Sequence, residues 1–151
     1  MKRISKHISY KEAVGSNYAK QKGIKNKPNE EQVENMQLLA EKVFEPLREW
    51  VGCPIKVNSM FRSQELNSAI KGSSTSSHMK GEAMDITRMA CGKENCKSNL
   101  DMFHWIKDNL EFDQLIWEFG SEPKWLHVSY NKDKNRKQVL VTKKRGVYYT
   151  Y

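Results

Sequence analysis

The chain has 151 residues, of which 38% are hydrophobic and 29% are charged, and this balance fits one compact domain. No stretch approaches the roughly 18 to 20 apolar residues of a membrane span, and the first residues lack the apolar core of a signal peptide. We therefore expect a single domain over residues 1–151 without a membrane span, made in the cytoplasm without a signal peptide. Aromatic residues make up 10% of the chain, which argues against disorder.

The net charge of +8 is concentrated in two segments. Residues 1–27 carry +7 and residues 131–145 carry +6, whereas the remainder carries −5. This distribution is typical of a protein that docks on an anionic polymer, either nucleic acid or cell wall, and an ordinary solvated surface fits it equally well. Tyrosines follow the basic residues 143–145, but no nucleic-acid motif accompanies them, so we expect no nucleic-acid partner.

The cysteines Cys53, Cys91 and Cys96 are odd in number, so at least one lacks an intramolecular partner. Cys91 and Cys96 bracket four residues. They could form a local bridge, or half of a thiolate zinc site whose other half would need Cys53 or a distant histidine. We interpret them as reduced loop thiols.

The clearest element is a helix between residues 29 and 51, where apolar residues recur at steps of three and four. Asn29 and Gln32 have the spacing of an N-terminal capping pair, and Gly52 follows the last apolar residue. Pro46 lacks a backbone donor, so it should kink the helix.

Shorter elements follow. We expect a strand, a helix, a polar loop and a second strand at residues 54–60, 63–70, 72–77 and 82–88. Alternation in the last segment places Asp85 on the face opposite to Met84 and Ile86, so a carboxylate points from a strand.

The C-terminal half alternates between a helix and strands. Ser98 with Asp101 predicts the start of a helix that runs to Leu110. Two strand-like segments around the turn 120–123 predict a β-hairpin, and a further strand pair is expected; the four segments are 112–119, 125–130, 138–142 and 146–151. Helices first and then an antiparallel-rich sheet indicate an α+β domain.

Two of the four histidines lie beside strand-like segments. His78 lies in a loop that turns at Gly81 into the strand that carries Asp85, and His127 lies on the second hairpin strand. Two neutral imidazoles and one carboxylate form a ligand set that leaves zinc one open position for water. Spacing alone is weak evidence, since a lone histidine on a strand more often makes ordinary hydrogen bonds.

The pattern Ser-x-His-x-x-Gly-x-Ala-x-Asp, which runs from Ser76 to Asp85, resembles the zinc-binding signature of the D-Ala-D-Ala carboxypeptidase and L-alanyl-D-glutamate peptidase family. That family is related in fold to the hedgehog signalling domain. Residues 44–48, 61–67 and 112–119 are similar to family blocks in family order, so the resemblance covers nearly the whole chain.

The resemblance implies a hedgehog-like peptidase fold, with helices packed on an antiparallel-rich sheet, and a single zinc ion. Its ligands would be His78, Asp85 and His127, the same set that the residues themselves suggest. Gly81 would serve the backbone geometry of the turn between the first two ligands.

A zinc peptidase also needs a carboxylate near the metal to take a proton from water and pass it to the leaving amine. Several relatives have this acid three residues before the last histidine, where this chain has Lys124. The hedgehog-like branch resembles this chain in placing a glutamate near the end of the preceding strand, where Glu118 stands. A hairpin could bring Glu118 across from His127. Glu122 in the turn is the fallback, and a solvent-facing role is the alternative for Glu118.

Two further residues are candidates for substrate binding. Arg62 resembles the family arginine that would hold a peptide carboxylate in a bidentate pair, and it is also a catalytic candidate that could help the metal to hold the oxyanion. An ordinary salt bridge to Glu65 is the alternative. Ser76 could contact substrate or cap its loop.

The activity implied by the resemblance is zinc-dependent hydrolysis of peptide bonds in peptidoglycan stem peptides, as a D-Ala-D-Ala carboxypeptidase or an L-alanyl-D-glutamate endopeptidase. Small enzymes of this kind without export signals resemble phage endolysins or virion components, so we expect a monomer that acts at the bacterial cell wall. The alternative is a catalytically silent, hedgehog-like zinc-binding or structural module.

Overall fold

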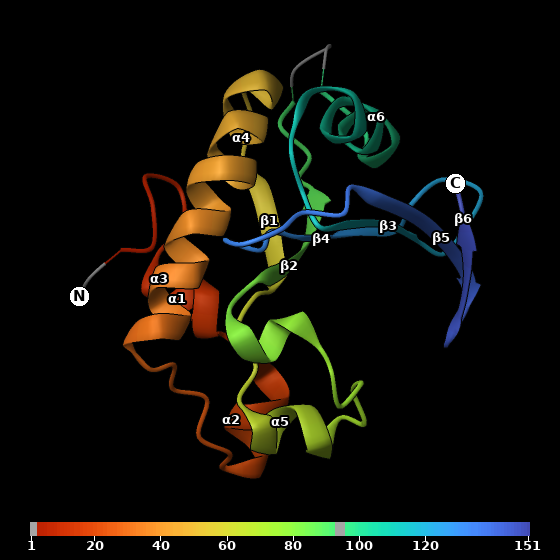
Figure 1. Cartoon of the computed structure of the whole chain (residues 1–151). Helices are drawn as coiled ribbons and strands as arrows, with labels where there is room; N and C mark the ends of the chain where they lie inside the picture. Colours follow the sequence, from red (N-terminus) through yellow and green to blue (C-terminus); the bar gives the residue numbers. More distant parts are fainter. Residues whose placement is uncertain (1–2, 93–95) are drawn as a thin grey trace.

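The computed structural model describes residues 3–92 and 96–151. One six-stranded sheet has the order β1-β2-β4-β3-β5-β6 (Figure 1). Its neighbours are antiparallel except for β3 and β5, which are parallel. The strands are β1 (Ile55–Ser59), β2 (Ala83–Arg88), β3 (Gln114–Glu118), β4 (Trp125–Ser129), β5 (Gln138–Lys144) and β6 (Val147–Thr150). The expected α+β class with an antiparallel-rich sheet is confirmed.

The helices pack on the sheet and are α1 (Tyr10–Val14), α2 (Asn17–Lys22), α3 (Glu30–Leu39), α4 (Glu45–Val51), α5 (Gln64–Ala69) and α6 (Asn99–Asn109). Helices α2 and α5 and the residues that follow α5 up to position 80 lie below the sheet in Figure 1; we call this part the lower lobe. A 3-10 turn covers Ser77–Lys80 and lies near α2 and α5 in the lower part of Figure 1. Among residues 3–92 and 96–151, no helix has both the length and the apolar content needed to span a bilayer.

The expected helix between residues 29 and 51 forms, with one irregular turn. Asn29 and Gln32 make the predicted capping box, and Gly52 ends the run with φ 70°. The π-helical segment Ala40–Phe44 joins α3 to α4. Pro46 follows it in the first turn of α4, where its missing N–H group costs little. The expected kink therefore takes the form of a π-helical turn ahead of the proline.

The two faces of the sheet have different environments. One face carries fully buried apolar side chains that pack with residues of α3, α4 and α6; they include Met84, Ile86, Leu115, Leu126 and Val128. Asp85, between two of these core residues, points from the opposite face. The alternation expected for this strand is therefore confirmed, and the second face is free to form a site.

The cysteines differ from the expectation of reduced loop thiols. Cys91 and Cys96 form a disulfide, and Cys53 is a buried free thiol. The Cα atoms of Cys91 and Cys96 are 6.6 Å apart, within the range that a disulfide spans. The sequence spacing does not reveal this distance, because it depends on how the chain returns from β2 to α6.

Candidate metal centre

The sheet register brings two of the three expected ligands together. Asp85 on β2 and His127 on β4 are direct cross-strand partners, so their side chains lie on the same face. His127 Nδ1 donates to Asp85 Oδ1 at 3.1 Å, and His78 Nε2 lies 3.3 Å from Asp85 Oδ2. Ligand atoms of all three residues lie within 4.8 Å of one another. The three residues singled out in the sequence therefore converge.

His78 is held by the 3-10 turn and by the chain beyond β1. Its side chain is buried, and its Nδ1 donates to the Met60 carbonyl oxygen at 2.7 Å. This bond fixes the tautomer, because the proton on Nδ1 leaves Nε2 with a lone pair that faces Asp85. Ser76 accepts a hydrogen bond from the His78 backbone N–H at 3.3 Å and so caps the turn.

The donor set fits a cation. A neutral His78 presents a lone pair at Nε2 to Asp85 Oδ2, and two acceptors 3.3 Å apart repel unless a proton or a metal ion lies between them. Burial acts to raise the pKa of Asp85, but the positive charge that His78 has when it is protonated, and the hydrogen bond from His127, outweigh burial and lower that pKa. The carboxylate is therefore ionised. Two imidazole nitrogens and a carboxylate oxygen are ligands that zinc prefers.

Gly81 allows the turn that carries His78 to pack on α3. Its φ is 74°, and a Cβ atom there would lie 2.4 Å from the Gln32 carbonyl oxygen. Gln32 Nε2 donates to the Met79 carbonyl oxygen at 3.0 Å, and Asn35 Nδ2 donates to the Lys80 carbonyl oxygen at 2.9 Å. Two side chains of α3 thus hold the last two residues of the turn, Met79 and Lys80. The backbone at position 81 then lies so close to α3 that only glycine fits there.

Glu118 lines the same cleft as the three ligands. Its direct cross-strand partner is Trp125, and His127 instead faces Ile116. Glu118 is therefore not the direct partner of His127: it lies two pairs further along the ladder, and the two residues are diagonal neighbours on one face. Burial, and secondarily Asp85, raise the pKa of Glu118 from 4.5 to about 7, against the opposing attraction of His127. A carboxyl with this pKa can both accept and donate a proton near neutrality.

The fallback residue Glu122 is placed differently. It is exposed in the β3–β4 turn and is not among the residues that line the cleft. The Lys124 backbone N–H donates to the Glu118 carbonyl oxygen at 3.0 Å, which closes this turn. The geometry therefore favours Glu118 over Glu122 as the proton acceptor.

Arg62 lies in the cleft beside the 3-10 turn. Its Nη2 donates to Ser76 Oγ at 3.3 Å, and its backbone N–H donates to the His78 carbonyl oxygen at 3.1 Å. Its Nε is buried and has no hydrogen-bond partner among the described residues, and no ion pair with Glu65 forms there. Burial lowers the pKa of Arg62, and Asp85 opposes this effect. A half-buried guanidinium that lines the cleft and has an unused donor is suited to a carboxylate ligand.

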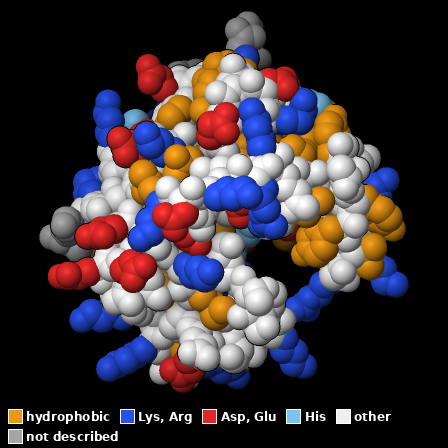
Figure 2. Space-filling view, in the orientation of Figure 1, with side chains coloured by type: hydrophobic (Ala, Val, Ile, Leu, Met, Phe, Trp, Pro, Cys, Tyr) orange, Lys and Arg blue, Asp and Glu red, His pale blue; other side chains and the backbone are white. Residues whose placement is uncertain are grey.

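The cleft has a volume of about 550 Å³ and is closed on one side by the β5–β6 hairpin. Figure 2 shows the surface hollowed between this hairpin and the lower lobe. Thr142 and Tyr148 line it, and Arg145 Nη2 donates to the Lys71 carbonyl oxygen at 3.3 Å, which connects the hairpin with the lobe. The sequence does not reveal these cleft residues, because the basic and aromatic character of the segment indicates only a charged surface.

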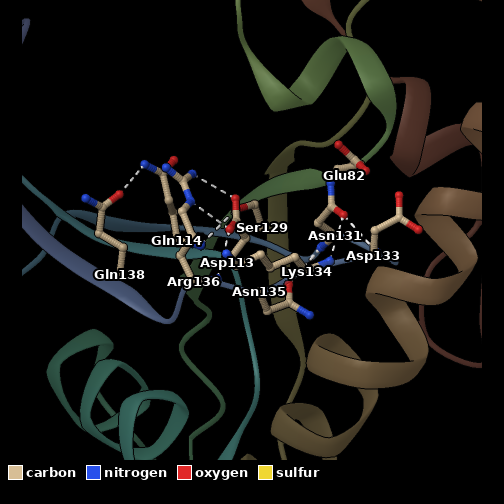
Figure 3. A network of polar contacts seen from close by, with 10 residues as sticks. All are labelled: Glu82, Asp113, Gln114, Ser129, Asn131, Asp133, Lys134, Asn135, Arg136 and Gln138. Carbon is tan, nitrogen blue, oxygen red and sulfur yellow. Dashed lines mark hydrogen bonds and ion pairs between the residues drawn. The ribbon is translucent and has the colours of Figure 1, made fainter.

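A polar network positions the strand that bears Glu118 (Figure 3). Asp113, just before β3, accepts hydrogen bonds from Arg136 Nε and Nη2, both at 2.9 Å. Gln114 Nε2 donates to Gln138 Oε1 at 2.8 Å, and the Gln114 backbone N–H donates to Ser129 Oγ at 3.0 Å. These contacts connect the start of β3 with β4 and β5, so the position of the strand that bears Glu118 is fixed at its N-terminal end.

The comparison with known families agrees with this geometry. A family model described as Peptidase M15 matches residues 6–129, a segment that contains Arg62, Glu118 and the three converging ligands. The β5–β6 hairpin lies beyond the matched segment. No curated protein matches the chain. Since the match covers most of the sequence and includes the three converging ligands, Glu118 and Arg62, the chain belongs to the Peptidase M15 family of zinc-dependent metallopeptidases.

Proposed function

We propose that the protein hydrolyses peptide bonds in the stem peptides of bacterial peptidoglycan, with one zinc ion held by His78, Asp85 and His127. The reaction would be that of a D-Ala-D-Ala carboxypeptidase or an L-alanyl-D-glutamate endopeptidase. One observation carries the proposal: three zinc-type ligands converge in the cleft that also holds Glu118, in a chain of a peptidase family.

Glu118 is the proposed proton carrier. When bound, zinc supplies a Lewis acid that polarises the scissile carbonyl group and lowers the pKa of water. The Glu118 carboxylate then accepts the proton of the attacking water and passes it to the leaving amine. Burial raises its pKa to about 7 in the metal-free protein, and a divalent cation in the same cleft would lower that pKa and so favour the carboxylate that accepts the proton. None of the three cysteines lines the cleft, so a thiol nucleophile has no place in this scheme.

Arg62 is the proposed anchor for a substrate carboxylate. Its buried Nε has an unused donor in the described structure, and a bidentate pair with a free carboxylate would satisfy it. Ser76 lines the cleft beside Arg62 and already accepts from its Nη2, so it holds the guanidinium plane in place. Stem peptides carry free carboxylates, and the net charge of +8 favours approach to an anionic wall.

The proposed setting is the bacterial cell wall, with the protein acting as a monomeric phage endolysin or a virion-associated enzyme. The second candidate is a zinc-binding module without catalysis. The observation that favours it is Lys124, which occupies the position where several relatives carry their catalytic acid.

Mass spectrometry of purified muropeptides tests the proposal. The protein should release D-alanine or cut between L-alanine and D-glutamate, a chelator should abolish the product, and added zinc should restore it. Glu118→Gln should retain zinc and lose activity by about a hundredfold or more, whereas the matched control Glu122→Gln should remain active. Full activity of Glu118→Gln would refute the assigned base. Stoichiometric zinc without product from any stem peptide would favour the non-catalytic module.

A further inference from the structure

A second group of ligand atoms lies outside the cleft. The Sγ atoms of Cys53, Cys91 and Cys96 are all within 4.8 Å of one another. Cys91 and Cys96 are joined, and Cys53 Sγ lies 2.8 Å from Cys91 Sγ. We propose that, in the reduced protein, these three sulfurs form a thiolate site for a thiophilic divalent cation of the zinc class. This site is separate from the peptidase centre and does not depend on its activity.

The sheet brings Cys53 and Cys91 together independently of the disulfide. Ile55 pairs with Arg88 in the antiparallel β1–β2 register. Cys53 precedes Ile55 by two residues and Cys91 follows Arg88 by three, so both chains leave the ladder at the same end. Their proximity follows from strand pairing, and reduction of the Cys91–Cys96 bond leaves that pairing intact.

Cys96 is held near the same place by Asn99. The buried amide of Asn99 accepts from the Arg88 backbone N–H at 2.8 Å and donates to Thr87 Oγ1 at 2.9 Å. It also donates to the Pro123 carbonyl oxygen at 3.0 Å. These bonds fix the first turn of α6, three residues after Cys96, against the end of β2. The three sulfurs are therefore positioned by β1, β2 and α6 and remain close when all are thiols.

The surroundings suit a partly buried thiolate cluster. Cys53 is 5% exposed, and Cys91 and Cys96 are half-buried against the core. Three thiolates and one divalent cation carry a net charge of −1, which is unfavourable in an apolar setting without a neighbouring positive charge. Lys97 directly follows Cys96 in the sequence, and its Nζ lies 4.7 Å from the centre of the Trp50 ring, so the nearest lysine in the sequence is held at the core rather than extended into solvent.

The Cys91–Cys96 disulfide must be reduced before the three sulfurs can bind a cation. A phosphine reductant gives two electrons to the Cys91–Cys96 bond and takes the oxygen of one water molecule to become its oxide, and the two protons of that water complete the two thiols. Binding of the cation then displaces the three thiol protons. Cys91 and Cys96 have the C-x4-C spacing found in thiolate zinc sites, and thiolates select zinc-class ions over calcium or magnesium. Three protein ligands leave one position for water.

Cobalt(II) is the probe for this site. Phosphine-reduced protein should bind cobalt with a sulfur-to-cobalt charge-transfer absorption in the near ultraviolet, and zinc should displace it. A site made of His78, Asp85 and His127 has no sulfur and gives no such absorption. The band should therefore persist in His127→Ala, which loses only the cleft site, so that the two centres are distinguished.

Single substitutions test the three-sulfur arrangement. Cys53→Ser and Cys91→Ser should each weaken cobalt binding at this site by at least about tenfold, with Cys53→Ala as a second variant because residue 53 is buried. Oxidised protein should show no band. The proposal is overturned if reduced, folded wild-type protein shows no charge-transfer absorption. It is equally overturned if both Cys53 variants bind with unchanged affinity, because the site would then be only the local C-x4-C pair.

Discussion

The carboxyl group of Glu118 makes the stability of the metal-free protein depend on pH. Its pKa rises from 4.5 to about 7 on folding, chiefly because of burial. Below about pH 4.5 the carboxyl group is protonated in the folded and in the unfolded state, so it does not change the free energy of unfolding. Between about pH 4.5 and about pH 7 the unfolded chain loses this proton first, so the free energy of unfolding falls as the pH rises. Above about pH 7 both states are deprotonated and the free energy of unfolding falls no further. The two pKa values differ by about 2.5, which corresponds to about 3 kcal/mol at most, and partial exposure of the side chain reduces this to about 1 to 2 kcal/mol.

Urea unfolding of wild-type protein and Glu118→Gln, both with a chelator, measures this effect. The stability advantage of Glu118→Gln should be about 1 to 2 kcal/mol larger at about pH 8 than at about pH 5. Glu122→Gln is the matched control, because Glu122 is exposed in the turn that follows β3 and lies outside the cleft. An identical pH dependence in Glu118→Gln and wild type would refute the raised pKa, and with it the reasoning that makes Glu118 the proton acceptor.

Three further predictions concern the support of the site. Gly81→Ala should lower the free energy of unfolding by about 2 to 3 kcal/mol, because the added Cβ would meet the Gln32 carbonyl oxygen. The control Gly23→Ala has open space around it and should lower the free energy of unfolding by about 1 kcal/mol. Equal losses for the two variants in urea titrations would contradict the contact at position 81. Asn99→Ala should cost about 2 to 4 kcal/mol, since it leaves several buried polar partners unsatisfied, and a cost below about 1 kcal/mol in the same titration would argue against them. A chelator should lower the melting temperature of wild type but not of His127→Ala in differential scanning fluorimetry; an unchanged wild-type value would count against the metal centre.

Much of the fold could be predicted where the local signal is strong. The capping pair Asn29 and Gln32, the pair Ser98 and Asp101, and the hairpin around residues 120–123 are present as expected. The helices α1 and α2 were missed, and the local signal that could have found them is the serine that caps each one, Ser9 and Ser16.

The parallel pairing of β3 with β5 could not be predicted either. It depends on the path of the chain between β4 and β5, which is held by the contact of Asp113 with Arg136. These residues lie 23 positions apart in the sequence, and no local pattern connects them.

Part of the candidate site could be predicted from the sequence, and part could not. The family signature pointed to His78, Asp85 and His127, and the structure brings these three together. The observed partner of Glu118, Trp125, lies two pairs away from the expected His127, because the register of a hairpin depends on the conformation of its turn, which composition does not determine. The cleft wall that contains Tyr148 depends on how the last two strands close over the sheet.

The direct pairing of Asp85 with His127 determines which alterations the molecule can tolerate. A shift of β4 by a single position would turn the imidazole toward the apolar interior and present Leu126 or Val128 to solvent instead. Residues inserted between β3 and β4 leave this pairing unchanged, whereas one deletion within β4 abolishes it. Loop grafting for new specificity is therefore best directed to the exposed turn at residues 120–122, with the length of both adjoining strands kept constant.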